Sequence, residues 1–325
     1  MSLLEFILKK LFTRFLVFLL ILTISFIIPR LMPGGAFAYL VENPNISPEY
    51  RNVLIRQFGL DKSIPEQYLF FLREFFLRGN LGISFYYRKP VMEVLLSALP
   101  WTLLLVTTSV IVSAIIGVFL GLISASKRGF FLDRALLNIS MFIESMPPFW
   151  LGLLFLIVFA YHLRLFPLYG VYTYGRIYGS FLEYFLDVIH HLTLPFITLV
   201  LLNTSGFIIL SRSMAIDVLT EDFVMIARAK GLSERKILSK HVLRPVLNPV
   251  LTITAINLGY SMGGALIVET VFSLPGIGKL MYDAVFMTDY PVLMGVVVLT
   301  SSVTLTLITI VEILASIIDP RVKGH

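Results

Sequence analysis

Long stretches of this 325-residue sequence contain no Asp, Glu, Lys or Arg. A helix needs roughly 20 apolar residues to cross the ~30 Å hydrocarbon core of a bilayer. We predict a transmembrane helix in each of six such stretches: Phe15–Ile28, Trp101–Ser126, Ser145–Leu163, Leu192–Ser211, Pro245–Val268 and Tyr290–Val311. The sequence therefore predicts an all-α membrane protein with a long connection between its first two helices.

The scarcity of charge excludes the common soluble classes. Charged residues make up 14% of the chain and hydrophobic residues 57%, whereas soluble domains carry roughly a quarter charged residues. So few charges cannot cover a water-soluble fold of this length, which excludes a cytosolic enzyme and a nucleic-acid-binding protein. The natural surroundings of the chain are a lipid bilayer.

The distribution of Lys and Arg predicts the orientation. With the N-terminus inside, 15 of the 26 basic residues fall on inner segments. Short outer loops keep Arg164, Arg176 and Lys279, and the rest lie in the first connection, which is too long to follow the positive-inside rule. Both termini are therefore expected to be cytoplasmic.

The first helix has an alternative interpretation. Lys9 and Lys10, an apolar core and Ala36–Ala38 resemble a cleaved signal peptide. Arg30 and Pro33 lie between that core and the cleavage site, which favours an uncleaved helix extended to Arg14, whose side chain can reach the interface.

Segment boundaries follow from these spans. We expect an N-terminal segment with the first helix at 1–31, an outer amphipathic segment at 32–100, a five-helix core at 101–318 with a cytoplasmic loop at 212–246, and a tail at 319–325. Within the outer segment, Pro48–Phe58 and Pro65–Arg78 read as short helices, the second ended by Gly79. Whether this segment is a structural cap or a gate stays open.

Small residues repeat at four-residue spacing in the second span, at Ser113, Gly117, Gly121 and Ala125. Small side chains let membrane helices approach closely, so we interpret this row as a packing site.

The inner loop contains two short capped helices. Thr220 is the expected N-cap of the first, which ends at Gly231, and Ser233 is the expected N-cap of the second, Glu234–His241. The first helix exposes Phe223, Met225 and Ile226. This pattern is typical of a docking surface, although a generic amphipathic hairpin would look similar.

Four motifs, which span nearly the whole chain and follow the family's order along it, resemble the permeases of binding-protein-dependent ABC importers, in the dipeptide/oligopeptide/nickel branch. The loop sequence Ala227-Arg-Ala-Lys-Gly-Leu-Ser-Glu-Arg235 resembles the EAA loop. Glu269-Thr-Val-Phe-Ser-Leu-Pro275-Gly276-Ile-Gly278-Lys279 resembles the stretch before the last helix. Gly79-Asn-Leu-Gly-Ile-Ser-Phe85 and Asp319-Pro-Arg321 also match.

The sequence departs from the family pattern at three places. The generic EAA loop has Glu where this chain has Met225. His241-Val-Leu-Arg244 replaces Ile-x-Leu-Pro, which is usual for this branch. Pro245 stands where Asn is common, and it may stiffen the start of the fifth helix without abolishing docking.

The resemblance implies a transport subunit of a prokaryotic plasma membrane. It implies that this subunit forms a heterodimer with a second, homologous permease and works with two ABC ATPase subunits and an extracellular solute-binding protein. It implies that the loop inserts into the ATPase, with Arg228 and Lys230 meeting acidic groups there. The residues that would couple the two subunits are Asp222, Phe223, Met225, Ile226, Ala227, Arg228, Ala229, Lys230, Gly231 and Leu232.

The residues themselves point to transport without catalysis. There is no phosphate-binding Gly-x-x-x-x-Gly-Lys-Ser/Thr loop, because Gly276-Ile-Gly-Lys279 is followed by Leu280. We therefore expect no cofactor on this chain, with ATP and Mg²⁺ bound by the partner ATPases. His190 and His191 could touch a metal in a nickel transporter, but no metal-ligand spacing is present, and two interfacial imidazoles are the simpler interpretation.

Polar residues in the fifth span, Thr254, Asn257, Tyr260 and Ser261, are candidates for lining the solute pathway, with interhelical hydrogen bonding as the alternative. Glu144, Glu269, Asp289 and Glu312 are all expected at span ends. An ion-driven secondary transporter needs ionisable groups near mid-membrane, and an intramembrane enzyme needs a buried nucleophile or paired acids, so both are disfavoured. Oligopeptide is the expected solute, with di- or oligosaccharide and nickel as alternatives.

Overall fold

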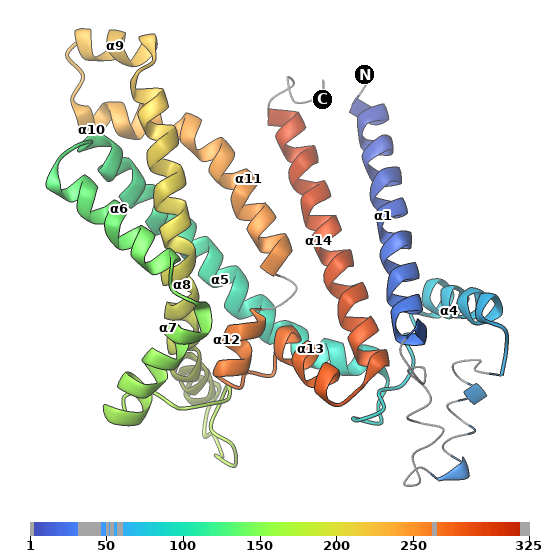
Figure 1. The fold of residues 1–325 in the computed structure, drawn as a ribbon. Coiled ribbons are helices and arrows are strands. Elements are labelled where there is room, and N and C mark those ends of the chain that lie inside the picture. The colour runs from blue at the N-terminus through green and yellow to red at the C-terminus, as the bar shows by residue number, and fades with distance from the viewer. Residues whose placement is uncertain are drawn as a thin grey trace. The chain divides into compact units, whose positions relative to one another are not determined.

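The computed structural model describes residues 3–31, 47–49, 52, 55–56, 61–261 and 265–318. Its regular elements are helices, which confirms the all-α class (Figure 1). In chain order they are α1 (Leu3–Leu31), α4 (Ile64–Arg78), α5 (Val91–Ser126), α6 (Phe131–Glu144), α7 (Pro148–Phe155), the π-helix η1 (Leu156–His162), α8 (Phe181–Leu219), α9 (Asp222–Ala229), α10 (Glu234–Ile237), the π-helix η2 (Leu238–Val242), α11 (Leu243–Ser261), α12 (Leu266–Val271), α13 (Ile277–Phe286) and α14 (Tyr290–Ile318).

Membrane-spanning candidates agree with the predicted set. Five helical segments of the described chain are long and apolar enough to cross a bilayer, and α6 with α7 and η1 passes the same test as a pair bent by 97°. Counting that pair as one broken span gives the six predicted spans.

The third predicted span is wrong at its start. Ser145 is where that span was expected to begin, but it lies in the break between α6 and α7. The search for charge-free runs missed α6 because Asp133 and Arg134 lie in its first turn and Glu144 is its last residue. The break follows from Pro147 and Pro148, which lack the N–H needed to continue the helix.

The fifth predicted span, Pro245–Val268, is likewise not one helix. α11 ends at Ser261, residues 262–264 lie outside the described part, and α12 starts at Leu266. The fourth is longer than predicted. α8 has 39 residues, about 58 Å at 1.5 Å per residue, which exceeds the ~30 Å hydrocarbon core.

The chain divides into two compact units. The first comprises 1–101, 262–266 and 276–325, and the second comprises 102–261 and 267–275. The segment boundaries expected from sequence stay a prediction.

In the first unit, α1 packs along α14 (Figure 1). The predicted helix Pro65–Arg78 is confirmed as α4, which begins with a capping box of Ser63 and Glu66 and ends at Gly79 with a φ of 61°. The hydrogen bond from the Ser63 hydroxyl lowers the pKa of Glu66. The predicted helix Pro48–Phe58 lies mostly outside the described residues.

In the second unit, α6 and α11 both pack against α8. Close approach of α5 to α8 depends on two glycines. A β-carbon added at Gly117 would overlap the Phe207 side chain, and one at Gly121 would lie 2.7 Å from Ser211 Cβ. The predicted packing role of this row is confirmed at these two positions.

Candidate coupling loop and solute pathway

The predicted docking loop follows directly from α8. Thr220 ends α8 as its C-cap and does not cap the next helix, as the sequence had suggested, because its hydroxyl donates back to Asp217 O. Glu221 is the N-cap residue of α9. Figure 1 shows α9 as a short helix beyond the end of α8. The second predicted helix is split, because α10 ends at Ile237 and η2 follows.

The α9 helix has two distinct faces. Val224 and Ala227 are 0% and 4% exposed and belong to an apolar cluster with Ile237 of α10 and Val242 of η2. Phe223, Met225 and Ile226 are 43%, 60% and 55% exposed. One face therefore attaches α9 to its own chain, while the other leaves three large apolar side chains uncovered in this chain.

The end of α9 is fixed by a glycine and an ion pair. Gly231 has a φ of 78°, which favours glycine because the residue has no β-carbon. Arg228 Nε donates to Glu234 Oε1 at 2.8 Å, and this hydrogen bond raises the pKa of Arg228. Leu232 is half-buried, while Asp222, Ala229 and Lys230 are exposed.

A buried ion pair lies near the C-terminal end of α8, which is the inner end in the orientation predicted from sequence, and we call Arg212 and Asp133 the inner ion pair. Arg212 Nε and Nη2 donate to the two Asp133 oxygens at 2.6 and 2.9 Å. Asp133 also accepts from Ser124 Oγ at 2.6 Å and from Gly129 N at 2.9 Å. This one carboxylate therefore joins α5, α6 and the turn between them to α8.

A cavity of about 300 Å³ lies among α6, α8 and α11 in the second unit. Of the four predicted pathway residues, Asn257 lines it. The Thr254 hydroxyl donates to Val250 O of its own helix at 2.7 Å. Tyr260 and Ser261 belong to α11, but their side chains lie outside the described part of the structure. The cavity is lined by Glu144, Leu202, Asn203, Gly206, Phe207, Leu210, Ile253 and Asn257.

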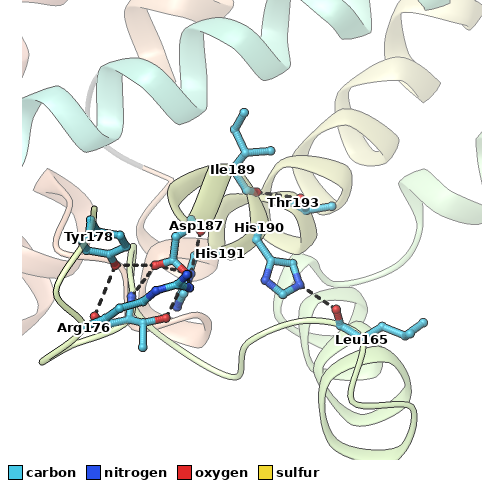
Figure 2. Close-up of polar contacts among 9 residues, drawn as sticks. Leu165, Arg176, Tyr178, Asp187, Ile189, His190, His191 and Thr193 are labelled. Atoms are coloured by element: carbon cyan, nitrogen blue, oxygen red, sulfur yellow. Dashed lines mark hydrogen bonds and ion pairs between the residues drawn. The ribbon is translucent and has the colours of Figure 1, made fainter. Parts of the chain in front are cut away.

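At the N-terminal end of α8, which is the outer end in the predicted orientation, Asp187 organises the preceding loop (Figure 2). Its carboxylate accepts from Thr173 N at 2.6 Å, from Thr173 Oγ1 at 3.0 Å and from Tyr178 Oη at 2.7 Å. Arg176 Nη1 is 3.7 Å away. Burial, followed by the hydrogen bond to Asp187, raises the pKa of Tyr178.

The two adjacent histidines of α8 contact backbone carbonyls. His190 Nε2 donates to Leu165 O at 2.7 Å and His191 Nδ1 donates to Asp187 O at 2.8 Å, as Figure 2 shows. Across the described residues, no group of three or more His, Cys, Asp or Glu could hold a metal ion. These contacts give both imidazoles a structural role.

The family-motif segment forms α12, a turn and the start of α13. Glu269 is 1% exposed and accepts from Thr102 Oγ1 at 2.7 Å. Pro275 is exposed, Gly276 is the N-cap residue of α13, and Gly278 is buried in that helix.

The second unit combines a broken membrane span beside a cavity lined in part by polar side chains with a short helix that carries an exposed apolar face at the end of a long helix. These are features of a membrane transport subunit that docks to another protein. Residues 117–324 match the family described as "Binding-protein-dependent transport system inner membrane component", and residues 3–106 match its N-terminal component. The chain belongs to this family.

Similar proteins cover nearly the whole chain. It is 35% identical over 301 residues to the oligopeptide transport system permease protein AppB of Bacillus subtilis, covering 92% of this chain and 93% of that one. It is 33% identical to the di/tripeptide transport system permease protein DppB of Pseudomonas aeruginosa, with 92% and 93% covered. For the dipeptide transport system permease protein DppB of Lactococcus lactis, the identity is 32% and the coverage 98% and 99%.

Family membership has direct consequences. The chain is a multi-pass protein of a prokaryotic plasma membrane and a transport subunit, not an enzyme. A solute-binding protein and an ATPase are the partners that this family implies.

Sequence reasoning missed several residues of the second unit. Asp133 and Asp187 fell outside the predicted spans, so neither was considered as a buried group. Arg212 was counted among the basic residues of the inner segments, and its pairing was not foreseen because its partner is 79 residues away. Glu144 was expected at a span end, but it lies at the bend of the broken span, since α6 precedes it.

Proposed function

We propose that this chain is one of two permease subunits of an ATP-driven peptide importer. Support for a peptide solute comes from the relatives, whose names specify oligopeptides, di/tripeptides and dipeptides. Sugar and nickel have no comparable support. A second, homologous permease would complete the membrane domain, and an extracellular binding protein would deliver the peptide.

In this proposal, α9 is the helix through which ATP hydrolysis on partner subunits drives the permease. The observation that carries it is the exposed face of Phe223, Met225 and Ile226. An uncovered apolar patch on a helix that is itself well packed on the opposite side fits a protein-docking surface. Two ATPase subunits, one under each permease, would bind ATP and Mg²⁺.

The packing behind α9 supports transmission of movement into the membrane. Val224 and Ala227 contact the same apolar cluster as Ala215 of α8 and Val246 of α11. A displacement of α9 would therefore be passed to two membrane helices, of which α11 carries the proposed pathway residues Thr254 and Asn257, followed by Tyr260 and Ser261.

The direct test is recovery of the partner ATPase with the tagged chain from native membranes, compared between wild type and Gly231→Asp. The substitution adds a β-carbon at a left-handed position, at a cost of about 1–2 kcal/mol, and a negative charge beside the docking face. We expect loss of ATPase recovery and of peptide uptake.

Gly175→Asp is the matched control. Gly175 has a φ of 77°, and no atom lies within 4 Å of an added β-carbon at either glycine. The backbone cost is therefore similar, but the site is in the loop before α8. Equal ATPase recovery and uptake in the two variants would contradict the assignment of α9 as the coupling helix.

A further inference from the structure

Glu144 is a carboxylate at an unusual place in a membrane protein. It is the last residue of α6, at the 97° break of the broken span. The charged turn at Lys127 and Arg128 belongs at the membrane surface, because burying it would be costly. Starting from that turn, the 14 residues of α6 cover about 21 Å at 1.5 Å per residue. Measured along the helix, Glu144 thus lies well within a ~30 Å hydrocarbon core.

The Glu144 side chain faces a cavity and is not packed against other side chains. Its side chain is exposed and lines the 300 Å³ cavity of the second unit. The described residues provide no cationic partner for it. Carboxylates inside a membrane domain face water-filled cavities and mark pathways for solutes or ions.

Two amide side chains line the same cavity. Asn203 Nδ2 donates to Leu199 O at 2.9 Å, which leaves its carbonyl oxygen without a donor among the described residues. The Asn257 amide makes no hydrogen bond within the described part of the chain. A half-buried amide in an apolar helix is costly unless it is hydrogen-bonded, so both groups are available to a solute or to water.

The electrostatics of the cavity favour a cation. One carboxylate and two amide oxygens are present, and none of the described lining residues is Lys, Arg or His. α6 also ends here, and the C-terminal end of a helix carries partial negative charge. A volume of about 300 Å³ is large for a bare ion and admits a polyatomic group.

We infer that this cavity binds an ammonium group of the transported peptide, with the Glu144 carboxylate as its counter-ion and the Asn203 and Asn257 carbonyl oxygens as further acceptors. An α-amino terminus and a lysine side chain share this chemistry. The inference rests on the proposed peptide transport and adds a contact within the pathway that recognises the charged group of the solute.

The sequence offers a direct test, because the chain contains no cysteine. Gly206 lines the cavity, and a β-carbon added there meets no atom within 4 Å. Gly206→Cys therefore places a single thiol of this chain in the cavity. The measurement is the rate of maleimide labelling of this variant in the assembled importer in membrane vesicles, with and without tri-alanine, N-acetyl-tri-alanine or N-acetyl-Ala-Lys-Ala.

We expect tri-alanine to slow the labelling and N-acetyl-tri-alanine to have little effect. Slowing by N-acetyl-Ala-Lys-Ala would show that a side-chain ammonium suffices, and its absence would assign the site to the amino terminus. Glu144→Gln should weaken the protection by about tenfold or more, because a charge-assisted contact is lost. Glu183→Gln, at the outer end of α8, is the charge-matched control and should keep full protection.

Equal protection by the free and acetylated tri-alanine peptides, or protection unchanged in Glu144→Gln, would overturn the ammonium site. Absence of protection by every peptide in an importer that takes up tri-alanine would also overturn it, while leaving the proposed function intact. Absence of peptide uptake by the wild-type importer would instead contradict the proposed function itself.

Discussion

The two ends of α8 are each held by a buried aspartate, but in different ways. At the inner end, Asp133 is paired with the Arg212 guanidinium, and the two side chains are 3% and 20% exposed. At the outer end, Asp187 accepts mainly neutral hydrogen bonds from Thr173 and Tyr178, and the nearest guanidinium, of Arg176, is 50% exposed. The inner contact joins helix to helix, whereas the outer contact joins a loop to a helix.

Because of this difference, we expect the inner contact of α8 to be rigid and the outer contact to be adaptable. Removing one member of a buried pair leaves an uncompensated charge, so the inner connection between α6 and α8 has few alternatives. A carboxylate held by neutral donors at a loop can exchange some of them for water. The end of α8 beside α9 is thus the stiffer one, which fits the proposed role of α8 in receiving movement from α9.

The largest effect is expected from Arg212→Met, which leaves Asp133 buried without its partner. Breaking a buried pair in this way costs on the order of 3–5 kcal/mol. The variant should show a lower unfolding temperature in detergent and a reduced yield of folded chain. Asp133→Leu combined with Arg212→Met should recover part of the loss. If Arg212→Met unfolded at the wild-type temperature, the claim that the inner contact of α8 is the stronger one would be wrong.

A smaller loss is expected from Asp187→Asn, which preserves the shape of the side chain but removes its charge. Hydrogen bonds to a charged group contribute about 1.5–3 kcal/mol, and part of this is retained by the amide. Hydrogen exchange of residues 170–178 should become faster, while the inner loop is unaffected. Faster exchange throughout α8 would show that the outer contact holds more than the loop.

The exposed ion pair of Arg228 and Glu234 can be compared directly with the buried pair of Arg212 and Asp133. The two side chains are 43% and 59% exposed, and pairs in such positions contribute roughly 0.2–1 kcal/mol. Glu234→Gln should therefore leave the unfolding temperature almost unchanged. A loss as large as that of Arg212→Met would mean that burial does not decide the strength of these pairs.

The smallest effect concerns pH and is confined to the outer loop. Burial and the hydrogen bond to Asp187 raise the pKa of Tyr178 above its ordinary value of 10.0. Because the neutral phenol is the donor, its contribution is complete below pH 10 and is lost as pH rises through the raised pKa. Exchange of residues 170–178 should accelerate only in that alkaline range. Tyr178→Phe should remove this pH dependence.

Sequence reasoning was most successful where the physical signal is local. Charge-free runs identified α1, α5, α8 and α14, and Gly79 and Gly231 correctly marked two helix ends at which the backbone has a positive φ. The amphipathic pattern also identified which side chains of α9 are exposed.

The pairing of distant charges could not be predicted in this way. α6 was missed because Asp133, Arg134 and Glu144 leave only a short charge-free run within it, and only the fold reveals that Arg212 compensates the first of them. Asp187 lies 14 positions after Thr173, and the chain between Thr173 and the start of α8 is irregular, so no periodicity indicates its course. The position of Glu144 inside the membrane domain could not be predicted either, because it depends on the broken span and on the cavity, and neither is visible in the sequence.

The glycine at position 117 has a consequence for engineering. It lies on α5 and does not line the cavity, but a β-carbon there would overlap Phe207, which does. The methyl group added by Gly117→Ala would thus force Phe207, which forms part of the cavity wall, to move. In the proposed pathway, solute size selection would therefore respond to a residue that does not line the cavity, and a library aimed at new substrates should include position 117 alongside the lining residues.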